Sequence, residues 1–404
     1  MFSCFSLFMC VFYFLDLPMD IFNTRLKEVS QFYQNGDTNL GFRRLIDSAL
    51  DTGSTLILKD IIQFTEWKYN SAPSGKSENE KAQELITKIR NAGAVISEKS
   101  TQNIITAKSV SKTYNKGNFK LGPLDISVNM GEVVGLVGEN GNGKTTLLRL
   151  LCGELKPSSG TIDYHFEESV KNNYDLRTKL VYIPQRIEQL RGGLMDNLQF
   201  TLNSHGITGE DNFFLAQVML ARMGLWTYKN LNWARLSSGY KMRFELARTL
   251  LRQPKVLLLD EPLANLDILA QQIILEDLRY LSVSLFRPFG IVLSSQQLYE
   301  VEKVSDKIIF LENGKLVSDS SVKNEEVTEN YLILEMDSPA ERNFIYENLK
   351  NSGLEKIHFN GGNYILFFSH DKTMSDVMSI IGKEKIPVSY LRDISNSSRR
   401  FFIN

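Results

Sequence analysis

The sequence predicts an α/β protein with a largely parallel central sheet, preceded by a small all-α module and followed by a small α+β unit. Three observations lead to this prediction. Almost continuously apolar runs at 133–137, 255–260 and 289–295 have the character of strands buried on both faces of a sheet. Apolar residues at helical spacing dominate 19–100, and strand-like and helix-like segments alternate again from 330 onward.

The overall composition is that of a folded globular protein long enough for several domains. The 404 residues are 43% hydrophobic and 23% charged, with a formal net charge of -1. A charge so near zero gives no general attraction to nucleic acid or anionic lipid. The three cysteines form no disulfide framework, and no two of the four histidines have the spacing of metal ligands. We therefore expect neither a nucleic acid partner nor a covalent cofactor.

The first 18 residues are predicted to be an apolar tail, separate from the domains. Residues 1–15 carry no charge, but they are fewer than the roughly 20 apolar residues that span a bilayer. No Lys or Arg precedes this run and no small-residue cleavage site follows it, so it does not fit a signal peptide. An ordinary amphipathic sequence begins at Met19. A mis-assigned start, or a disordered or membrane-touching tail, is favoured over a transmembrane helix.

Residues 19–100 are predicted to form the all-α module, and nothing in them suggests chemistry. Apolar residues at helical spacing predict helices around 22–33, 42–50, 58–67 and 81–92. The polar segment 70–80 is predicted to be a linker, and Gly93 to end the last helix.

Residues 329–404 are predicted to form an α+β appendix. Its segments follow the order strand, helix, strand, strand, helix, strand, which is typical of a ferredoxin-like unit. The first of its helices is predicted to begin with Ser338 as N-cap, Pro339 as first helical residue and Glu341 closing a capping box, and to end at Gly353.

The central unit, predicted to span 101–328, contains a glycine-rich loop typical of phosphate binding. The segment GENGNGKTT at 138–146 lies between an apolar strand and an apolar helix, and fits the pattern G-x-x-x-x-G-K-[ST]. Glycines let successive backbone N–H groups turn toward phosphate oxygens, and the N-terminus of the following helix attracts negative charge. The candidate nucleotide-binding residues in this loop are Gly138, Asn140, Gly141, Asn142, Gly143, Lys144, Thr145 and Thr146.

Charged and hydroxyl groups near this loop are candidates for metal binding and catalysis. Lys144 is expected to reach the β- and γ-phosphates as a catalytic residue, and Thr145 to ligate Mg²⁺. The strand VLLLDEP at 256–262 delivers Asp260 and Glu261 to its carboxyl end, where ligands bind in open α/β sheets. Asp260 is a candidate metal ligand. Glu261 is a candidate catalytic residue that polarises the attacking water, an effect worth about 10²–10⁴-fold in rate.

With these two motifs in order, the chain resembles the ATP-binding cassette (ABC) family of P-loop NTPases. Further segments carry the resemblance: YIPQR at 182–186, RLSSGYKMRFELARTLL at 235–251 and LANLD at 263–267. The resemblance covers about 104–325. It implies ATP and Mg²⁺ as cofactors and a helical subdomain at about 186–245.

The resemblance also implies roles for individual residues. Gln185 corresponds to a glutamine that touches Mg²⁺ and the attacking water. Ser237 and Gly239 belong to a signature that usually reads Leu-Ser-Gly-Gly-Gln, and they are expected to face a γ-phosphate. Asp267 is the acidic residue of a loop that lines the dimer seam. Tyr114 lies where the family places an aromatic ring on adenine.

Two features depart from the family pattern. The signature has Ser238 and Tyr240 in place of its usual glycine and glutamine. Gln296 stands where the family has a catalytic histidine. A glutamine amide can donate a hydrogen bond to a γ-phosphate oxygen, but it cannot carry a proton or a positive charge. We therefore interpret Gln296 as the catalytic residue of a weakened switch.

The resemblance implies the ATP-hydrolysing subunit of a transporter. ATP would join two cassettes and hydrolysis would release them. The expected partners are a membrane permease on a separate chain and a second cassette, most simply in a homodimer. The expected location is cytoplasmic, on the inner face of the cell membrane. The appendix resembles that of the type 2 exporter branch, which favours export. A soluble cassette ATPase without a transport role and a weakly active regulatory cassette stay open as alternatives.

Overall fold

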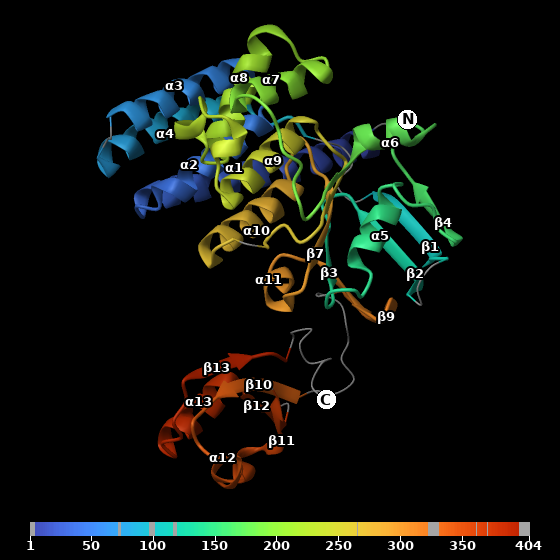
Figure 1. Ribbon diagram of the computed structural model, residues 1–404. Coiled ribbons are helices and arrows are strands. Elements are labelled where there is room, and N and C mark those ends of the chain that lie inside the picture. Colours follow the sequence, from blue (N-terminus) through green and yellow to red (C-terminus); the bar gives the residue numbers. More distant parts are fainter. Residues whose placement is uncertain are drawn as a thin grey trace.

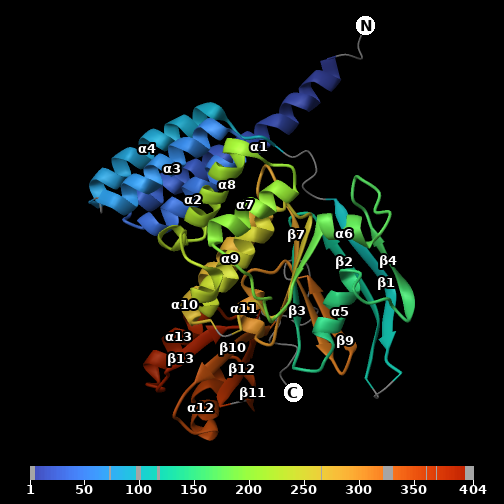
Figure 2. The same ribbon diagram turned by 45° about the horizontal axis from the view of Figure 1, so that its top comes forward.

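The order of the folded parts confirms the predicted fold class. The computed structural model describes residues 5–71, 74–96, 102–115, 119–264, 266–321, 331–360, 362–369 and 371–395. Four helices come first, followed by an α/β unit with two sheets, and a four-stranded sheet with two helices comes last (Figures 1 and 2).

The N-terminal module consists of four helices. They are α1 Phe5–Gln34, α2 Thr38–Asp51, α3 Thr55–Ser71 and α4 Gly75–Ala92. Since α1 is continuous from Phe5, the predicted tail and the first predicted helix share one helix, while residues 1–4 lie outside the described part of the chain. Among the described helices, none has both the length and the apolar character needed to cross a membrane.

The predicted linker at 70–80 is wrong for most of its length. Helix α4 begins directly after Ser74, whose side chain accepts a hydrogen bond from a backbone N–H of the first turn. Glu78 in that first turn is buried and forms an ion pair with Lys68 of α3. The cap and the ion pair together stabilise a helix in a segment whose polar composition suggested a loop.

The central sheet has six strands in the order β5-β6-β7-β3-β8-β9, and only β8 and β9 pair antiparallel. Its strands are β3 Val133–Val137, β5 Leu180–Ile183, β6 Val256–Leu259, β7 Gly290–Ser295, β8 Lys307–Glu312 and β9 Lys315–Ser321. Every residue of β3, β6 and β7 is buried, which confirms the expected burial on both faces. A second, antiparallel sheet has the order β2-β1-β4, with β1 Asn103–Thr113, β2 Lys120–Asn129 and β4 Ser159–Tyr164.

The helices of the central unit cover both faces of the six-stranded sheet. They are α5 Lys144–Leu151, α6 Asn173–Lys179, α7 Leu194–Ser204, α8 Gly209–Arg222, α9 Ser238–Leu251, α10 Ile268–Ser282 and α11 Leu298–Glu302. Because successive strand residues point to opposite faces, Leu257 and Ile291 join the core with α7–α10. Leu258 and Val292 join the core with α5 and the antiparallel sheet.

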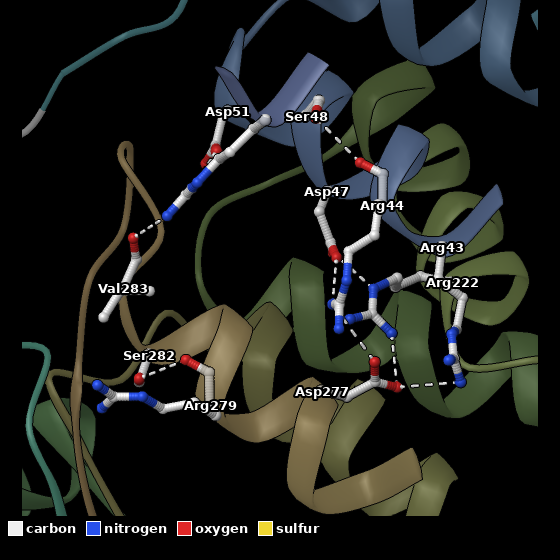
Figure 3. Close-up of polar contacts among 11 residues, drawn as sticks. Arg43, Arg44, Asp47, Ser48, Asp51, Arg222, Asp277, Arg279, Ser282 and Val283 are labelled. Carbon is white, nitrogen blue, oxygen red and sulfur yellow. Dashed lines mark hydrogen bonds and ion pairs between the residues drawn. The ribbon is translucent and has the colours of Figure 1, made fainter. Parts of the chain in front are cut away.

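The N-terminal module packs against α8, on the side of the molecule away from β1, β2 and β4 (Figure 2). Its apolar core continues into the central unit and includes Val218 and Ala221 of α8 as well as Trp226. A buried ion network adds to this contact (Figure 3). Arg222 of α8 is 0% exposed; its Nε donates to Asp47 of α2 at 2.5 Å and its Nη1 to Asp277 of α10 at 2.9 Å.

The appendix has the predicted order of strands and helices. Its elements are β10 Tyr331–Asp337, α12 Arg342–Leu349, β11 Leu354–Asn360, β12 Asn363–Ser369, α13 Met374–Lys383 and β13 Tyr390–Asp393. The sheet order is β11-β12-β10-β13, and all neighbours are antiparallel, as expected for a ferredoxin-like unit. Arg392 of β13 lies 3.6 Å from the Glu302 carboxylate of α11, an ion pair between the appendix and the central unit.

The predicted start of the first appendix helix is wrong. Helix α12 begins at Arg342, and its N-cap Glu341 makes no side-chain capping bond. The Ser338 hydroxyl instead donates to the carbonyl of Pro387 at 2.5 Å and accepts from the backbone N–H of Ala340. A long-range bond thus uses the side chain that the local pattern assigned to a cap, while the left-handed Gly353 ends the segment as predicted.

We predict that Asp47→Ala lowers the free energy of unfolding by about 3–5 kcal/mol, because it leaves Arg222 short of one of its two buried carboxylates. Urea denaturation followed by circular dichroism measures this loss. Asp60→Ala is the control, since it removes only a partly exposed ion pair with Lys88 and should cost about 0–1 kcal/mol. Similar losses for both variants would show that the buried network does not stabilise the fold.

Candidate nucleotide-binding site

The loop between β3 and α5 needs glycine at several positions. Gly141 and Gly143 have φ values of +86° and +102°, in the left-handed region that favours glycine. A Cβ on Gly143 would lie 2.7 Å from a Leu121 methyl carbon, and one on Gly138 would lie 2.4 Å from the carbonyl oxygen of Leu311. The loop therefore wraps closely against its surroundings, and its shape depends on these glycines.

The ammonium of Lys144 folds back over this loop. Lys144 is buried, and its Nζ donates to the carbonyl oxygens of Gly138 at 2.6 Å and Glu139 at 3.2 Å. Its Nζ also lies 3.1 Å from Oε1 of Glu261. Helix α5 begins at Lys144 itself, and its N-cap Gly143 has no side chain that could accept from the N–H groups of the first turn. The loop thus combines a cation with backbone donors, as anion binding requires.

Asp260, at the end of β6, is the centre of a cluster of hydroxyl groups. Its buried carboxylate accepts from Thr145 Oγ1 at 2.8 Å, from the Tyr182 hydroxyl at 3.1 Å and from Ser294 Oγ at 2.8 Å. Burial, together with the neighbouring Asp260 carboxylate, raises the pKa of Tyr182, so its phenol stays protonated and can donate. The Ser294 hydroxyl also accepts from the backbone N–H of Glu261 at 2.9 Å.

The sequence did not single out Tyr182 or Ser294. Each lies on a strand that is a direct neighbour of β6, β5 on one side and β7 on the other. Both therefore reach the same edge of the sheet as Asp260. In the sequence, each of these residues is only a polar side chain near the end of an apolar run. That it contacts Asp260 follows from the order of the strands in the sheet.

Glu261 and Gln296 approach the loop from the ends of β6 and β7. Glu261 has a φ of +49°, a conformation that a non-glycine residue adopts at some cost and that turns it sharply out of the strand. The amide of Gln296 donates to Asn140 Oδ1 at 2.9 Å, so the predicted switch position contacts the phosphate loop. Both side chains that sequence analysis proposed for catalysis beside Lys144 lie at this loop.

The candidate metal ligands face a common space. Thr145, Gln185 and Asp260 line one cavity of about 740 Å³ at the carboxyl edge of the sheet. All three carry side-chain oxygens, which are the ligands that Mg²⁺ prefers. Among the described residues, no cluster of three His, Cys, Asp or Glu side chains is placed to hold a metal by itself. The donor set therefore fits Mg²⁺ that completes its coordination with substrate phosphates and water.

Tyr114 and Asn142, two further candidate nucleotide-binding residues, contact the loop or its surroundings. The hydroxyl of Tyr114 is 3.4 Å from Thr146 Oγ1, and Tyr114 is 41% exposed, so a flat partner can reach it beside the loop. Asn142 Oδ1 accepts from the backbone N–H of Asn313 at 3.0 Å. That bond holds the loop against the turn between β8 and β9.

Two residues that the resemblance places at the dimer seam, Ser237 and Asp267, lie at exposed helix starts. Ser237 is the N-cap of α9 and accepts from the N–H of Tyr240, with Gly239 in the first turn. Asp267 is the N-cap of α10 and accepts from the N–H of Ala270 at 2.8 Å. The described residues that line the 740 Å³ cavity do not include Ser237, Gly239 or Asp267.

A glycine-rich loop after β3, a buried lysine and an acid at the end of β6 define a P-loop nucleotide-binding protein. Comparison with known proteins identifies the family within this class. The family of ABC transporters matches residues 121–264. The methionine import ATP-binding protein MetN 2 of Listeria monocytogenes is 30% identical over 295 residues, which cover 70% of this chain and 84% of that protein.

Two other relatives match over shorter lengths. The phosphonates import ATP-binding protein PhnC of Treponema denticola is 28% identical over 233 residues, 54% of this chain and 89% of that protein. The ABC transporter ATP-binding protein NatA of Bacillus subtilis is 30% identical over 203 residues, 48% of this chain and 78% of that protein. The chain belongs to the ATP-binding subunits of ABC transporters, and it is an ATPase of this family.

We predict that Gly143→Ala weakens ATP binding by at least about tenfold, which is 1.4 kcal/mol. The new methyl group combines backbone strain with overlap onto Leu121. Titration with a fluorescent ATP analogue measures the affinity. Gly141→Ala is the matched control, since its Cβ meets no atom within 4 Å and only the backbone strain remains. An equal loss in both variants would mean that close packing of the loop is unimportant.

Proposed function

We propose that this chain powers a separate membrane permease through ATP-driven pairing of two cassettes. The observation that carries the proposal is the convergence of Lys144, Glu261 and Gln296 on one glycine-rich loop. These groups supply a cation for the phosphates, a carboxylate for water and an amide donor near the γ-phosphate.

Binding of ATP requires Lys144 to change partners. Its Nζ is held by Glu261 and by two loop carbonyls, and we propose that phosphate oxygens replace these acceptors. The replacement releases the Glu261 carboxylate, which can then orient a water molecule for in-line attack. Mg²⁺ bound at Thr145, Gln185 and Asp260 would neutralise charge on the phosphates. Tyr114 would stack on the adenine ring.

A second cassette supplies the groups that a single chain keeps away from the loop. Ser237, Gly239 and Asp267 lie at the starts of α9 and α10, where Ser237 and Asp267 are exposed. We propose that they face the phosphate loop of a second copy, so that two ATP molecules are bound between two chains. Hydrolysis would then release the copies from one another.

The permease and the direction of transport belong to the same proposal. The relatives named above include importers of methionine and phosphonates, which are the cargoes of those proteins. Export by this chain stays a prediction from its appendix. Attachment to the inner face of the membrane would follow from binding to the permease.

Co-purification of the chain with one membrane protein tests the transport role against the alternative of an ATPase that has no transport role.

We predict that Glu261→Gln abolishes ATP hydrolysis while ATP binding survives, because the amide cannot polarise the attacking water. The rate should fall by at least about 100-fold in a phosphate-release assay. Size-exclusion chromatography with light scattering should show ATP-dependent dimers that persist in this variant. Glu139→Gln is the control, since Glu139 holds Lys144 through its backbone carbonyl only. Equal phosphate release by wild type and Glu261→Gln would refute the assigned role and favour a regulatory cassette.

We also predict that Gln296→His speeds hydrolysis several-fold. A histidine can keep an N–H donor near Asn140 and can in addition carry a proton toward the γ-phosphate. Steady-state ATPase rates at saturating ATP measure the effect. Gln297→His is the control at the adjacent position, where Gln297 is the N-cap of α11. A rate unchanged or reduced in Gln296→His would mean that the loop has been rebuilt around glutamine.

A further inference from the structure

A second cavity lies where the N-terminal module meets the central unit. It measures about 250 Å³ and is lined mainly by α2, α8, α9 and α10, with Tyr69 of α3, near the ion network of Figure 3. We call it the junction cavity. The residues that matter for its chemistry are Phe42, Arg43, Arg222, Arg243, Leu246 and Asp277. None of them belongs to the nucleotide site.

The junction cavity carries an excess of positive charge. Its lining includes three arginines, whereas Asp277 is the only acidic side chain among the described lining residues. Asp277 already accepts from Arg222 Nη1 at 2.9 Å and lies 3.5 Å and 3.8 Å from the guanidiniums of Arg44 and Arg43. Asp47 also pairs with Arg222 and Arg44. Two carboxylates therefore stand against four guanidiniums, those of Arg43, Arg44, Arg222 and Arg243, and cannot neutralise all of them.

Buried donors in the cavity lining are left without acceptors. Nη2 of Arg222, on a side chain that is 0% exposed, has no hydrogen-bond acceptor among the described residues, and neither does Nε of Arg43. Burial lowers the pKa of Arg43, although Asp277 opposes this effect. Buried guanidinium N–H groups need acceptors, because leaving them unsatisfied forfeits their hydration without replacement.

Arg243 adds a third cation from α9. It forms no ion pair with any described residue, and its guanidinium carbon lies 5.8 Å from the centre of the Tyr240 ring. Its Nη1 lies beside Gly224, where a Cβ would come within 3.3 Å of it. The absence of a side chain at Gly224 thus leaves room for Arg243 at the junction.

We propose that the junction cavity binds a small organic anion. The carboxylate of this ligand would accept from the three arginines, whose planar N–H groups match two carboxylate oxygens. Its apolar body would lie against Phe42 and Leu246. Inorganic phosphate also has the required acceptors, but the apolar part of the lining favours an organic molecule.

The ligand would contact four helices that belong to different parts of the fold. Helix α2 is in the N-terminal module, and α8 is in the helical subdomain. The N-caps of α9 and α10 are Ser237 and Asp267, two of the proposed contacts to a second cassette. Occupancy would oppose relative movement of these helices and slow the ATPase cycle. This last step rests on the proposed function, whereas binding of the anion does not.

The experiment is isothermal titration calorimetry of the full chain, without nucleotide, against benzoate and hexanoate. Benzamide and hexanamide are the uncharged controls, and inorganic phosphate is the inorganic one. We expect both carboxylates to bind at least about tenfold more tightly than their amides, since hydrogen bonds to a charged group are the stronger ones. Arg243→Gln should weaken benzoate binding at least about tenfold. Arg90→Gln, an exposed arginine of α4, should leave it unchanged.

Ile273→Trp tests the same site without removing a charge. Ile273 lines the cavity, so the larger ring should fill it and abolish benzoate binding while the thermal unfolding midpoint stays near that of wild type. The proposal is overturned if the carboxylates do not bind, as for a cavity that holds only water. It is also overturned if amides bind equally, if phosphate alone binds, or if neither Arg243→Gln nor Ile273→Trp alters binding. An inactive ATPase would leave these binding results unaffected.

Discussion

A buried ammonium at the phosphate loop is the constraint on which the rest of the site depends. A positive charge withdrawn from water must be paired. Lys144 meets this requirement with two carbonyl oxygens of its own loop and the carboxylate of Glu261. For those oxygens to converge, the loop must adopt left-handed turns at glycine, and Glu261 must leave its strand with a positive φ. The local backbone is thus arranged around one charge.

The same charge links the phosphate loop to the proposed catalytic carboxylate. Glu261, the proposed catalytic carboxylate, is also the group that neutralises the lysine. In the proposed cycle, phosphate oxygens that compete for Lys144 would act on Glu261 at the same moment, so binding and activation would share one ion pair. Asp260 is separate from this exchange, because its carboxylate accepts from three hydroxyl groups while the ion pair of Lys144 is with Glu261.

Sequence patterns predicted the parts of the fold that depend on local information. Apolar runs predicted β3, β6 and β7, and the glycine-lysine pattern predicted the loop between β3 and α5. Strand order is not local, so the hydroxyls of Tyr182 and Ser294 around Asp260 were not foreseen. Resemblance placed Gln296 at the switch position but did not indicate its contact with Asn140.

The two wrong helix starts have the same kind of cause. At α4, an ion pair with a preceding helix stabilises a segment whose composition is typical of a linker. At α12, Ser338 bonds to Pro387, a residue far along the chain, rather than to the turn that follows it. In both cases a tertiary contact decides a boundary that a short window of sequence assigns differently.

The N-terminal module and α8 share one apolar core, so a division of the chain between them would break this core. A cassette produced without the module would present Val218, Ala221 and Trp226 to water as a continuous apolar patch. Arg222, beside them, would lose Asp47 as its partner. Exposed patches of this kind promote self-association. We therefore expect a cassette that is cut off near residue 100 to be less soluble than the chain that keeps the module.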